Sequence, residues 1–241
     1  MTETHAATVR RLGVTGTDTG IGKTVVTCAL AARARQRGVR VAAMKPVESG
    51  IEERPVSPTG LASDAERLRA ACGDGDPMSL VRPYVLEEPL APLVAAQRAG
   101  VTIEVAALDA ARAELERERD LLLVEGAGGL LVPITPTLSY ADLFSRWQCD
   151  LLLVAGNRLG VLNHVLLTVR AAEAAGLSLA GIVLTSLGPH ALSVAEATNH
   201  EALRQLLPTH TILRFPWVDR LDDFAALAMA AQAAGLDVLL P

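Results

Sequence analysis

A glycine-rich stretch near the N-terminus restricts, more than any other feature, how this chain can fold. A short apolar strand over 12–14 runs into a loop rich in Gly and Thr, and a helix over 25–37 follows Gly22-Lys23-Thr24. This order predicts a loop that binds phosphate groups. Its glycines let backbone N–H groups turn toward an anion, and the start of the helix adds free N–H groups. Lys23 is then expected to reach the β- and γ-phosphates, and the Thr24 hydroxyl to bind Mg²⁺.

The spacing of this loop differs from the common motif by one residue. Five residues separate Gly16 from Gly22, where the common motif has about four, and Thr17 occupies the position of the first glycine. A glycine-rich turn beside a surface lysine is the alternative interpretation. The strand before the loop and the helix after it favour phosphate binding, because the motif needs both.

A second lysine lies at the end of the next predicted strand, which covers 39–44. Pro46 disfavours helical backbone at Lys45, so this lysine is expected at the carboxyl edge of the strand. Open α/β sheets bind their ligands at this edge. A solvated surface lysine is the alternative, and the neighbouring phosphate loop favours a role in binding.

A carboxylate follows another predicted strand in the same way. Residues 121–124 are four consecutive apolar residues, as in a strand buried on both faces of a parallel sheet. Glu125 ends this run, and Gly126, Ala127 and Gly128 follow it. In proteins with a phosphate loop, a carboxylate at this point holds Mg²⁺, directly or through water. A carboxylate without a partner would be costly to bury, which favours a function for Glu125.

Strands and helices alternate along the chain, which predicts an α/β fold. We expect one P-loop NTPase-like domain over 1–241, with a mainly parallel sheet and helices on both faces. Residues 1–10 are expected to form a flexible arm, 48–60 a loop, and 83–92 a proline-rich connection. The remaining predicted strands cover 150–155, 179–184 and 211–214. The remaining predicted helices cover 63–71, 93–98, 103–119, 139–147, 161–175, 191–207 and 224–234.

Composition excludes several classes of partner. The formal net charge is −5 and no basic block is present, which argues against nucleic acid. No apolar run approaches the roughly 18 residues that a membrane-spanning helix needs. Cys28, Cys72 and Cys149 form neither a metal motif nor a disulfide framework, so a reducing cytoplasm is expected. Aromatic residues make up 3% of the chain, so we expect an aliphatic core.

Three predicted strand ends together suit a Mg²⁺–nucleoside triphosphate. Lys23 and Mg²⁺ would neutralise the transferred phosphoryl group, and Lys45 would hold an anionic acceptor close to it. Two helix starts are open to more than one interpretation. Ser63 or Asp64 is more simply an N-cap. The helix that starts after Gly160 offers free N–H groups to an anion, or is a plain helix start.

Seven segments, in the same order, resemble the dethiobiotin synthetase family and together span nearly the whole chain. They cover 14–24, 45–50, 63–65, 124–129, 159–164, 180–182 and 216–217. The loop Gly-Thr-Asp-Thr-x-x-Gly-Lys-Thr, with its extra residue, and the segment Lys-Pro-x-x-Ser-Gly are the most specific. The resemblance implies an ATP-dependent carboxylation of 7,8-diaminononanoate with CO₂ in biotin synthesis. A carbamate forms on one amine, accepts the γ-phosphoryl group as a carbamic–phosphoric anhydride, and is closed by the second amine with release of phosphate.

The resemblance also implies roles for individual residues. Thr24, Asp64 and Glu125 would hold Mg²⁺, while Lys23 and Lys45 would stabilise carbamate and phosphoryl charge. The implied catalytic residues are Lys45, Lys23, Thr19 and Ser49. The implied nucleotide-binding residues are Gly20, Ile21, Gly22, Lys23, Thr24, Val25, Asp64, Glu125, Gly126, Ala127, Gly128, Thr185, Ser186, Pro216, Trp217 and Val218. The implied substrate-binding residues are Thr19, Lys45, Ser49, Gly128, Gly160, Val161 and Asn163.

The segment 160–164 resembles the part of these enzymes that binds the substrate carboxylate across a dimer interface. A homodimer with shared sites is therefore expected. Two positions depart from the family pattern. Gly20 stands where some members carry an acidic residue, which removes a contact to the diamine. Thr185-Ser186 stands where some members read adenine with Asn-Asp, and neither side chain offers the paired donor and acceptor of an amide. We therefore expect triphosphates other than ATP to be accepted.

Two other classes of protein share this kind of nucleotide domain. Partner-regulated switch ATPases of the septum-site or plasmid-partition type carry a second lysine early in the phosphate loop, at the position that Asp18 occupies here. Synthetases of cobyrinate chemistry usually carry a glutaminase domain with a Cys nucleophile, for which 241 residues leave no room. Both features favour the dethiobiotin synthetase interpretation, with the switch ATPase as the main alternative.

Overall fold

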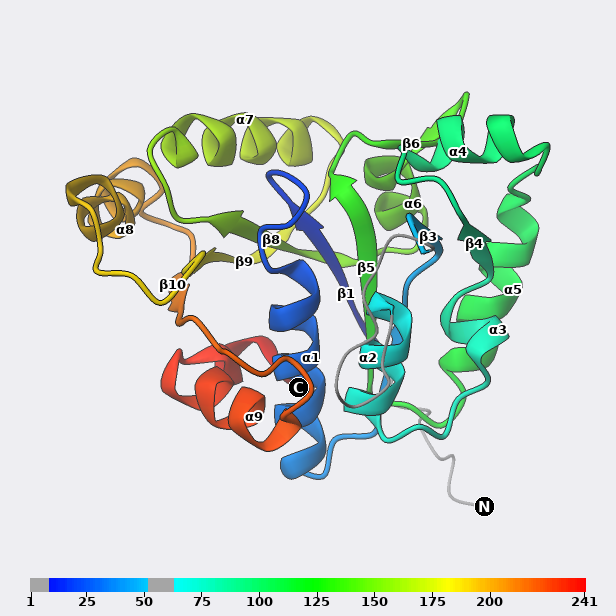
Figure 1. The fold of residues 1–241 in the computed structure, drawn as a ribbon, viewed down its shortest axis with the longest axis horizontal. Helices are drawn as coiled ribbons and strands as arrows, with labels where there is room; N and C mark the ends of the chain where they lie inside the picture. The colour runs from blue at the N-terminus through cyan, green and yellow to red at the C-terminus, as the bar shows by residue number, and fades with distance from the viewer. Residues whose placement is uncertain (1–8, 52–62) are drawn as a thin grey trace, which may run out of the picture.

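Six parallel strands form the central sheet of the computed structural model, which describes residues 9–51 and 63–241 (Figure 1). Their order in the sheet is β10–β9–β8–β1–β5–β2. Their bounds are Arg10–Gly16 (β1), Val41–Met44 (β2), Leu121–Gly129 (β5), Asp150–Gly156 (β8), Leu179–Thr185 (β9) and Ile212–Phe215 (β10). From β1 the chain moves to β2 on one side, and β8 later pairs with β1 on the other side. Ligands bind at such a reversal, beside the carboxyl ends of the strands.

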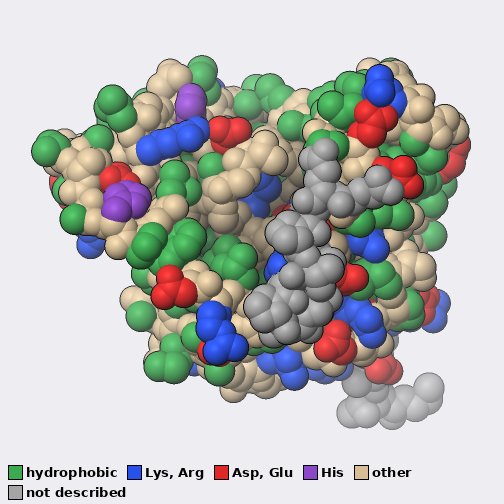
Figure 2. Space-filling model, viewed as in Figure 1, with side chains coloured by type: hydrophobic (Ala, Val, Ile, Leu, Met, Phe, Trp, Pro, Cys, Tyr) green, Lys and Arg blue, Asp and Glu red, His purple; other side chains and the backbone are tan. Residues whose placement is uncertain are grey.

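Helices cover both faces of this sheet, because successive residues of a strand point to opposite sides. In β5, Leu121 and Leu123 pack on the first face, whereas Leu122 and Val124 pack on the second. The helices of the first face are α1 (Lys23–Gln36), α2 (Asp64–Cys72) and α9 (Phe224–Ala233). Those of the second face are α5 (Val105–Leu115), α6 (Tyr140–Arg146), α7 (Val161–Ala174) and α8 (Val194–Leu206). The predicted α/β fold with a mainly parallel sheet is therefore confirmed. In the view of Figure 1, the surface is hollowed near the carboxyl ends of β1 and β5 (Figure 2).

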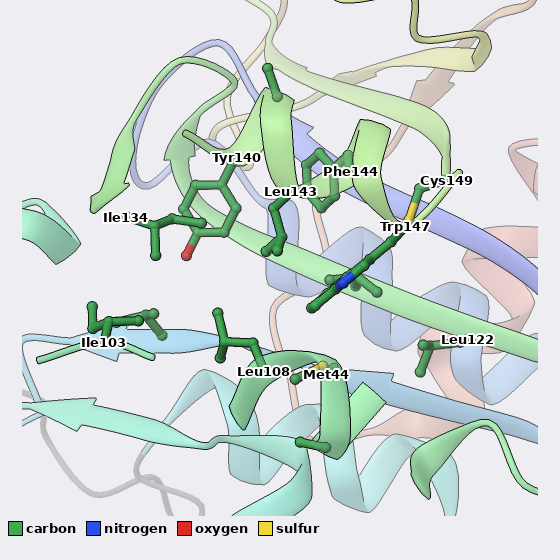
Figure 3. Close-up of a cluster of buried hydrophobic side chains, with 14 of the residues drawn as sticks. Met44, Ile103, Leu108, Leu122, Ile134, Tyr140, Leu143, Phe144, Trp147 and Cys149 are labelled. Carbon is green, nitrogen blue, oxygen red and sulfur yellow. The ribbon is translucent and has the colours of Figure 1, made fainter. Parts of the chain in front are cut away.

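An aromatic cluster packs on the second face of the sheet, where Tyr140, Phe144 and Trp147 gather around Leu143 (Figure 3). The ring centroids of Tyr140 and Phe144 are 5.8 Å apart. The ring of Phe144 also lies over Gly13 of β1, where a side chain would collide with it. This contact fixes β1, the strand that leads into the phosphate loop, from the second face of the sheet. Elsewhere the described core is mostly aliphatic, as the low aromatic content predicts.

Most of the predicted long elements are found within a few residues of their expected bounds. α1 begins at Lys23, earlier than predicted, and α5 ends at Leu115, well before the predicted end. α8 begins later than predicted, because the side chain of Ser193 caps it by accepting from the backbone N–H of Glu196. None of the helices in the described part of the chain combines the length and the hydropathy that crossing a bilayer requires.

Short elements also lie in segments for which the sequence predicts no helix or strand. The loop expected over 48–60 is wrong at its start, because β3 (Val47–Ser49) pairs in parallel with β4 (Tyr84–Leu86). Residues 1–8 of the expected arm and 52–60 of the expected loop lie outside the described residues. The other short elements are α3 (Met78–Val81), β6 (Pro133–Thr135), β7 (Leu138–Ser139) and a 3₁₀ turn over Leu236–Leu239. The helix predicted over 93–98 is confirmed as α4 (Pro92–Ala99).

Candidate active site

The phosphate loop connects β1 to α1 and turns at Gly22, whose φ of 94° is a conformation that glycine adopts readily. Lys23 begins α1 and is only 6% exposed. Its Nζ donates to the backbone oxygen of Asp18 at 2.8 Å, so the ammonium group folds back over the loop. Burial, and next the charge of Lys45, lower the pKa of Lys23 to about 8. An anionic ligand beside Lys23 would favour the charged form of this lysine and oppose the effect of burial.

Four side chains from four elements meet beside this loop. Lys45, which follows β2, donates through Nζ to Glu125 Oε1 at 2.6 Å and to Asp64 Oδ2 at 3.0 Å. Thr24 Oγ1 donates to the same Oε1 atom of Glu125 at 2.8 Å. Burial by itself lowers the pKa of Lys45, but the carboxylates of Asp64 and Glu125 outweigh burial and raise the pKa above its ordinary value. Lys45 is therefore a fully charged ammonium group held in one place.

The donor set in this cluster fits Mg²⁺. Thr24, Asp64 and Glu125 offer a hydroxyl and two carboxylates, and Mg²⁺ prefers oxygen ligands of this kind together with phosphates. Glu125 is fully buried, and its Oε2 atom has no hydrogen-bond partner among the described residues. A buried carboxylate oxygen without a partner is costly, and a cation would offset that cost. Within the described residues, no group of three or more His, Cys, Asp or Glu side chains forms a separate metal site.

A cavity of about 780 Å³ opens above these groups, at the hollow in the centre of Figure 2. Most of the predicted site residues line it: Thr19, Gly20, Ile21, Gly22, Lys23, Thr24, Val25, Lys45, Ser49, Asp64, Ala127, Gly128, Thr185, Ser186, Pro216, Trp217 and Val218. Glu125 and Gly126 are buried beneath the lining. Pro89, Leu90 and Pro92 add an apolar wall that the sequence analysis did not assign to the site.

The two predicted hydroxyl contacts differ in their surroundings. Thr19 is exposed at the rim of the cavity, and its backbone N–H donates to Asp18 Oδ1 at 2.8 Å. Ser49 ends β3, and its Oγ donates to the backbone oxygen of Leu90 at 2.8 Å. Ser49 therefore also fixes the segment that leads into the apolar wall of the cavity.

Glu48 is a buried residue of the site that the sequence analysis left without a role. Its side chain is fully buried, and its Oε1 accepts from the backbone N–H of Asp64 at 2.7 Å. Its Oε2 accepts from Arg82 Nη1 at 2.9 Å. Of the two predicted N-cap candidates, Ser63 is the N-cap of α2 and accepts from the backbone N–H of Glu66, whereas Asp64 is the first residue of the helix. The sequence shows a charged residue inside the Lys45–Gly50 motif, which could have drawn attention to Glu48. Its partners lie far away in the sequence and could not be identified from the motif.

The helix start at Gly160, Val161 and Asn163 is not among the described residues that line the cavity. Arg158, just before this helix, donates through Nη2 to Asp18 Oδ2 at 2.8 Å. This ion pair joins the phosphate loop to the segment in front of α7. Asp18, which stands where switch ATPases carry their second lysine, therefore pairs with Arg158.

The sheet and its phosphate loop define a phosphate-loop nucleotide-binding protein, and comparison with known proteins agrees. A family model described as an AAA domain matches residues 10–225. FtsY from Mycoplasma mycoides superimposes with a TM-score of 0.51 at 17% identity, over 92% of this chain and 68% of that protein, which is a likeness of fold alone.

Similarity in sequence is more specific. A protein of Anaeromyxobacter dehalogenans named ATP-dependent dethiobiotin synthetase is 43% identical over 208 residues, covering 83% of this chain and 90% of the relative. A protein of Escherichia coli with the same name is 37% identical over 218 residues, covering 90% of this chain and 95% of the relative. The chain belongs to the ATP-dependent dethiobiotin synthetase family. This finding favours the main interpretation over the switch ATPase.

Proposed function

We propose that this chain converts 7,8-diaminononanoate, CO₂ and ATP to dethiobiotin, ADP and phosphate. The single observation that supports this most is the family similarity, since the matched range 10–225 includes Lys23, Lys45 and Glu125. The charged cavity agrees with it, because phosphoryl transfer needs mainly positioning and charge neutralisation from the protein.

The residues of the cavity suit each step of this reaction. CO₂ adds to one amine, which loses a proton and becomes a carbamate. A carbamate oxygen then takes the γ-phosphoryl group, which turns a poor leaving oxygen into a good one. The second amine attacks the carbamate carbon, closes the cyclic urea and releases phosphate. Lys45 would hold the carbamate, and Lys23 would stabilise the charge on the phosphoryl group during its transfer. Thr19 and Ser49 would contact the carbamate or the diamine.

Magnesium is part of this proposal. Thr24, Asp64 and Glu125 would hold Mg²⁺, which when bound supplies positive charge to the phosphate oxygens. Lys45 already touches Asp64 and Glu125, so its ammonium group lies beside the proposed metal ligands. The carbamate and the γ-phosphate would therefore meet between the Lys45 ammonium group and Mg²⁺.

We propose a homodimer in which one subunit completes the substrate site of the other. Gly160, Val161 and Asn163 would bind the carboxylate of the diamine from the partner. Beside this helix start, Leu159 is 85% exposed, and Val194 at the start of α8 is 83% exposed. Light scattering on the wild type tests the dimer, and a monomer at micromolar concentration would contradict it.

We also propose that the nucleotide site accepts triphosphates other than ATP, as the departure at Thr185-Ser186 implies. A cytoplasmic location is proposed because Cys28, Cys72 and Cys149 are all free thiols in the structure. Neither nucleic acid nor a membrane is among the proposed partners.

The experiment that tests the activity is phosphate release from purified protein with ATP, Mg²⁺ and bicarbonate, with and without 7,8-diaminononanoate. We expect release to depend on the diamine, with a cyclic urea product found by mass spectrometry. Release that is indifferent to the diamine would contradict the proposed synthetase and favour the switch ATPase.

A further inference from the structure

Thr185, the last residue of β9, lies directly against the phosphate loop. Its hydroxyl is 2.6 Å from the backbone oxygen of Ile21 and 3.3 Å from that of Ala155. The side chain is only 3% exposed. A hydroxyl has one proton to donate, and the shorter contact shows that Ile21 receives it.

The contact orients one peptide group of the phosphate loop. In a trans peptide, the C=O of one residue and the N–H of the next point in opposite directions. With the Ile21 oxygen held by Thr185, the N–H of Gly22 points away from the Thr185 hydroxyl, and Gly22 itself lines the cavity. Backbone N–H groups at this point of a phosphate loop are the ones that bind phosphate oxygens.

Packing also places Thr185 close to Gly22. The methyl carbon of Thr185 lies 3.3 Å from the place that a Cβ atom at Gly22 would take. Gly22 has a φ of 94°, and a side chain there would crowd the Thr185 methyl group, so glycine suits this turn on both counts. Thr185 thus lies against the turn that precedes Lys23 and holds it through the Ile21 oxygen.

The Thr185 hydroxyl and two backbone groups of this strand end form hydrogen bonds within the protein. The backbone oxygen of Thr185 accepts from Asn157 N at 2.9 Å, and the N–H of Ser186 donates to the oxygen of Phe215 at 3.0 Å. A base lying in the cavity would therefore find no free proton on the Thr185 hydroxyl. A contact of Thr185 with the triphosphate half of the ligand, through the loop, fits these distances better than a contact with the base.

We infer that Thr185 is a positioning residue of the phosphate loop, which holds the Ile21–Gly22 peptide in the orientation that binds a triphosphate, whatever its base. This inference rests on the proposed use of a nucleoside triphosphate. Thr185 would then contribute to the affinity for the triphosphate, whereas the family pattern implies recognition of the base at this position.

The test uses two variants that separate the hydroxyl from the methyl group. Thr185→Val keeps the shape of the side chain but removes the hydroxyl proton, and Thr185→Ser keeps the hydroxyl. Dissociation constants are measured for ATP, CTP and inorganic tripolyphosphate with Mg²⁺ and without the diamine. We expect Thr185→Val to weaken all three by the same factor of about ten, the effect of one buried carbonyl that loses its donor. Thr185→Ser should stay within about twofold of the wild type.

The kinetics give a second measurement. Thr185→Val should raise the KM for ATP and leave kcat at saturating ATP within about twofold, because a properly bound triphosphate reacts as before. A general loss of structure would lower kcat as well, so thermal unfolding is followed for each variant. Where Thr185→Val does not fold, Thr185→Ala is measured with the same ligands.

Three results would overturn the inference. Weaker ATP binding with unchanged tripolyphosphate binding would make Thr185 a reader of the base. Unchanged binding of all three ligands by folded Thr185→Val or Thr185→Ala would remove any role for the hydroxyl. Wild-type protein that binds neither ATP nor tripolyphosphate would contradict the proposed function itself, and the positioning role with it.

Discussion

Glu48 and Arg82 form an ion pair under the proposed metal site, with Arg82 Nη1 2.9 Å from Glu48 Oε2. Glu48 is fully buried, while the Arg82 side chain is 16% exposed. The other oxygen of Glu48 accepts from the backbone N–H of Asp64, so the pair fixes the place where α2 begins. Arg82 Nη1 also donates to Ser63 Oγ at 3.1 Å, which ties the N-cap of α2 to the same pair.

Glu48→Gln should therefore destabilise the protein and weaken Mg²⁺ binding together. The amide keeps the size of the side chain but leaves the Arg82 charge without its buried counterpart, which costs about 3 kcal/mol of unfolding free energy. Loss of a group that orients a metal ligand typically weakens metal affinity by about 10- to 100-fold. Urea unfolding and Mg²⁺ titration of nucleotide binding measure the two effects.

The matched control for this prediction is Glu88→Gln. Glu88 and Arg98 form a pair of similar length, 2.7 Å, but their side chains are 45% and 60% exposed. Exposed pairs contribute less than about 1 kcal/mol, so this variant should resemble the wild type. Equal and small effects of both substitutions would show that the burial of Glu48 does not matter.

Lys45→Ala should abolish turnover in a protein that still folds but is less stable, because the buried Glu125 carboxylate loses the ammonium group that pairs with it. The ammonium group lies 2.6 Å from Glu125 and 3.0 Å from Asp64, where the proposed acceptor and Mg²⁺ meet. Phosphate release in the presence of the diamine measures turnover, and circular dichroism checks the fold. Turnover close to that of the wild type would remove Lys45 from the proposed mechanism.

The long elements and the phosphate loop could be predicted because their signals are local. Residues 121–124 are continuously apolar since β5 is buried on both faces, and Ser63 marks the start of α2 by its capping chemistry. Strands of three residues, such as β3 and β4, show no periodicity that a pattern could reveal.

Contacts between distant residues could not be predicted in this way. Glu48 and Arg82 are 34 positions apart, and Thr185 and Ile21 are 164 apart. Each partner alone is an ordinary residue, and only the sheet order brings β9 beside the loop after β1. The resemblance indicated that Thr185 belongs to the site, but the direction of its hydroxyl depends on tertiary structure.

The identity of residues 185 and 186 also predicts that the site accepts several nucleoside triphosphates. Since neither Thr185 nor Ser186 offers the paired donor and acceptor of an Asn amide, ATP, CTP and GTP should have affinities within about tenfold of one another. Competition binding with Mg²⁺ and equal concentrations of the three nucleotides measures this. A wide preference for ATP would show that other groups of the cavity read adenine.

Glu125→Gln should weaken the dependence of nucleotide binding on Mg²⁺. The amide has nearly the same size, but it removes the negative charge from a side chain that contacts Thr24 and Lys45. Half-saturation should move to a Mg²⁺ concentration at least about tenfold higher. Nucleotide binding is measured across a Mg²⁺ titration, and an unchanged curve would count against Glu125 as a metal ligand.

Gly13→Ala should destabilise the fold through a direct collision beneath the phosphate loop. A Cβ atom at Gly13 would lie 2.8 to 3.1 Å from three ring carbons of Phe144, which is fully buried and cannot move aside freely. Overpacking of this kind costs about 1–3 kcal/mol.

Urea unfolding measures the effect of Gly13→Ala, and Gly75→Ala is its control. Gly75 is exposed, and a Cβ atom there would meet no atom within 4 Å. The double variant Gly13→Ala/Phe144→Leu should recover part of the lost stability, because the smaller side chain removes the ring carbons that collide. If Gly13→Ala were as stable as Gly75→Ala, β1 would have to shift without cost, and Phe144 would not fix the strand that carries the phosphate loop.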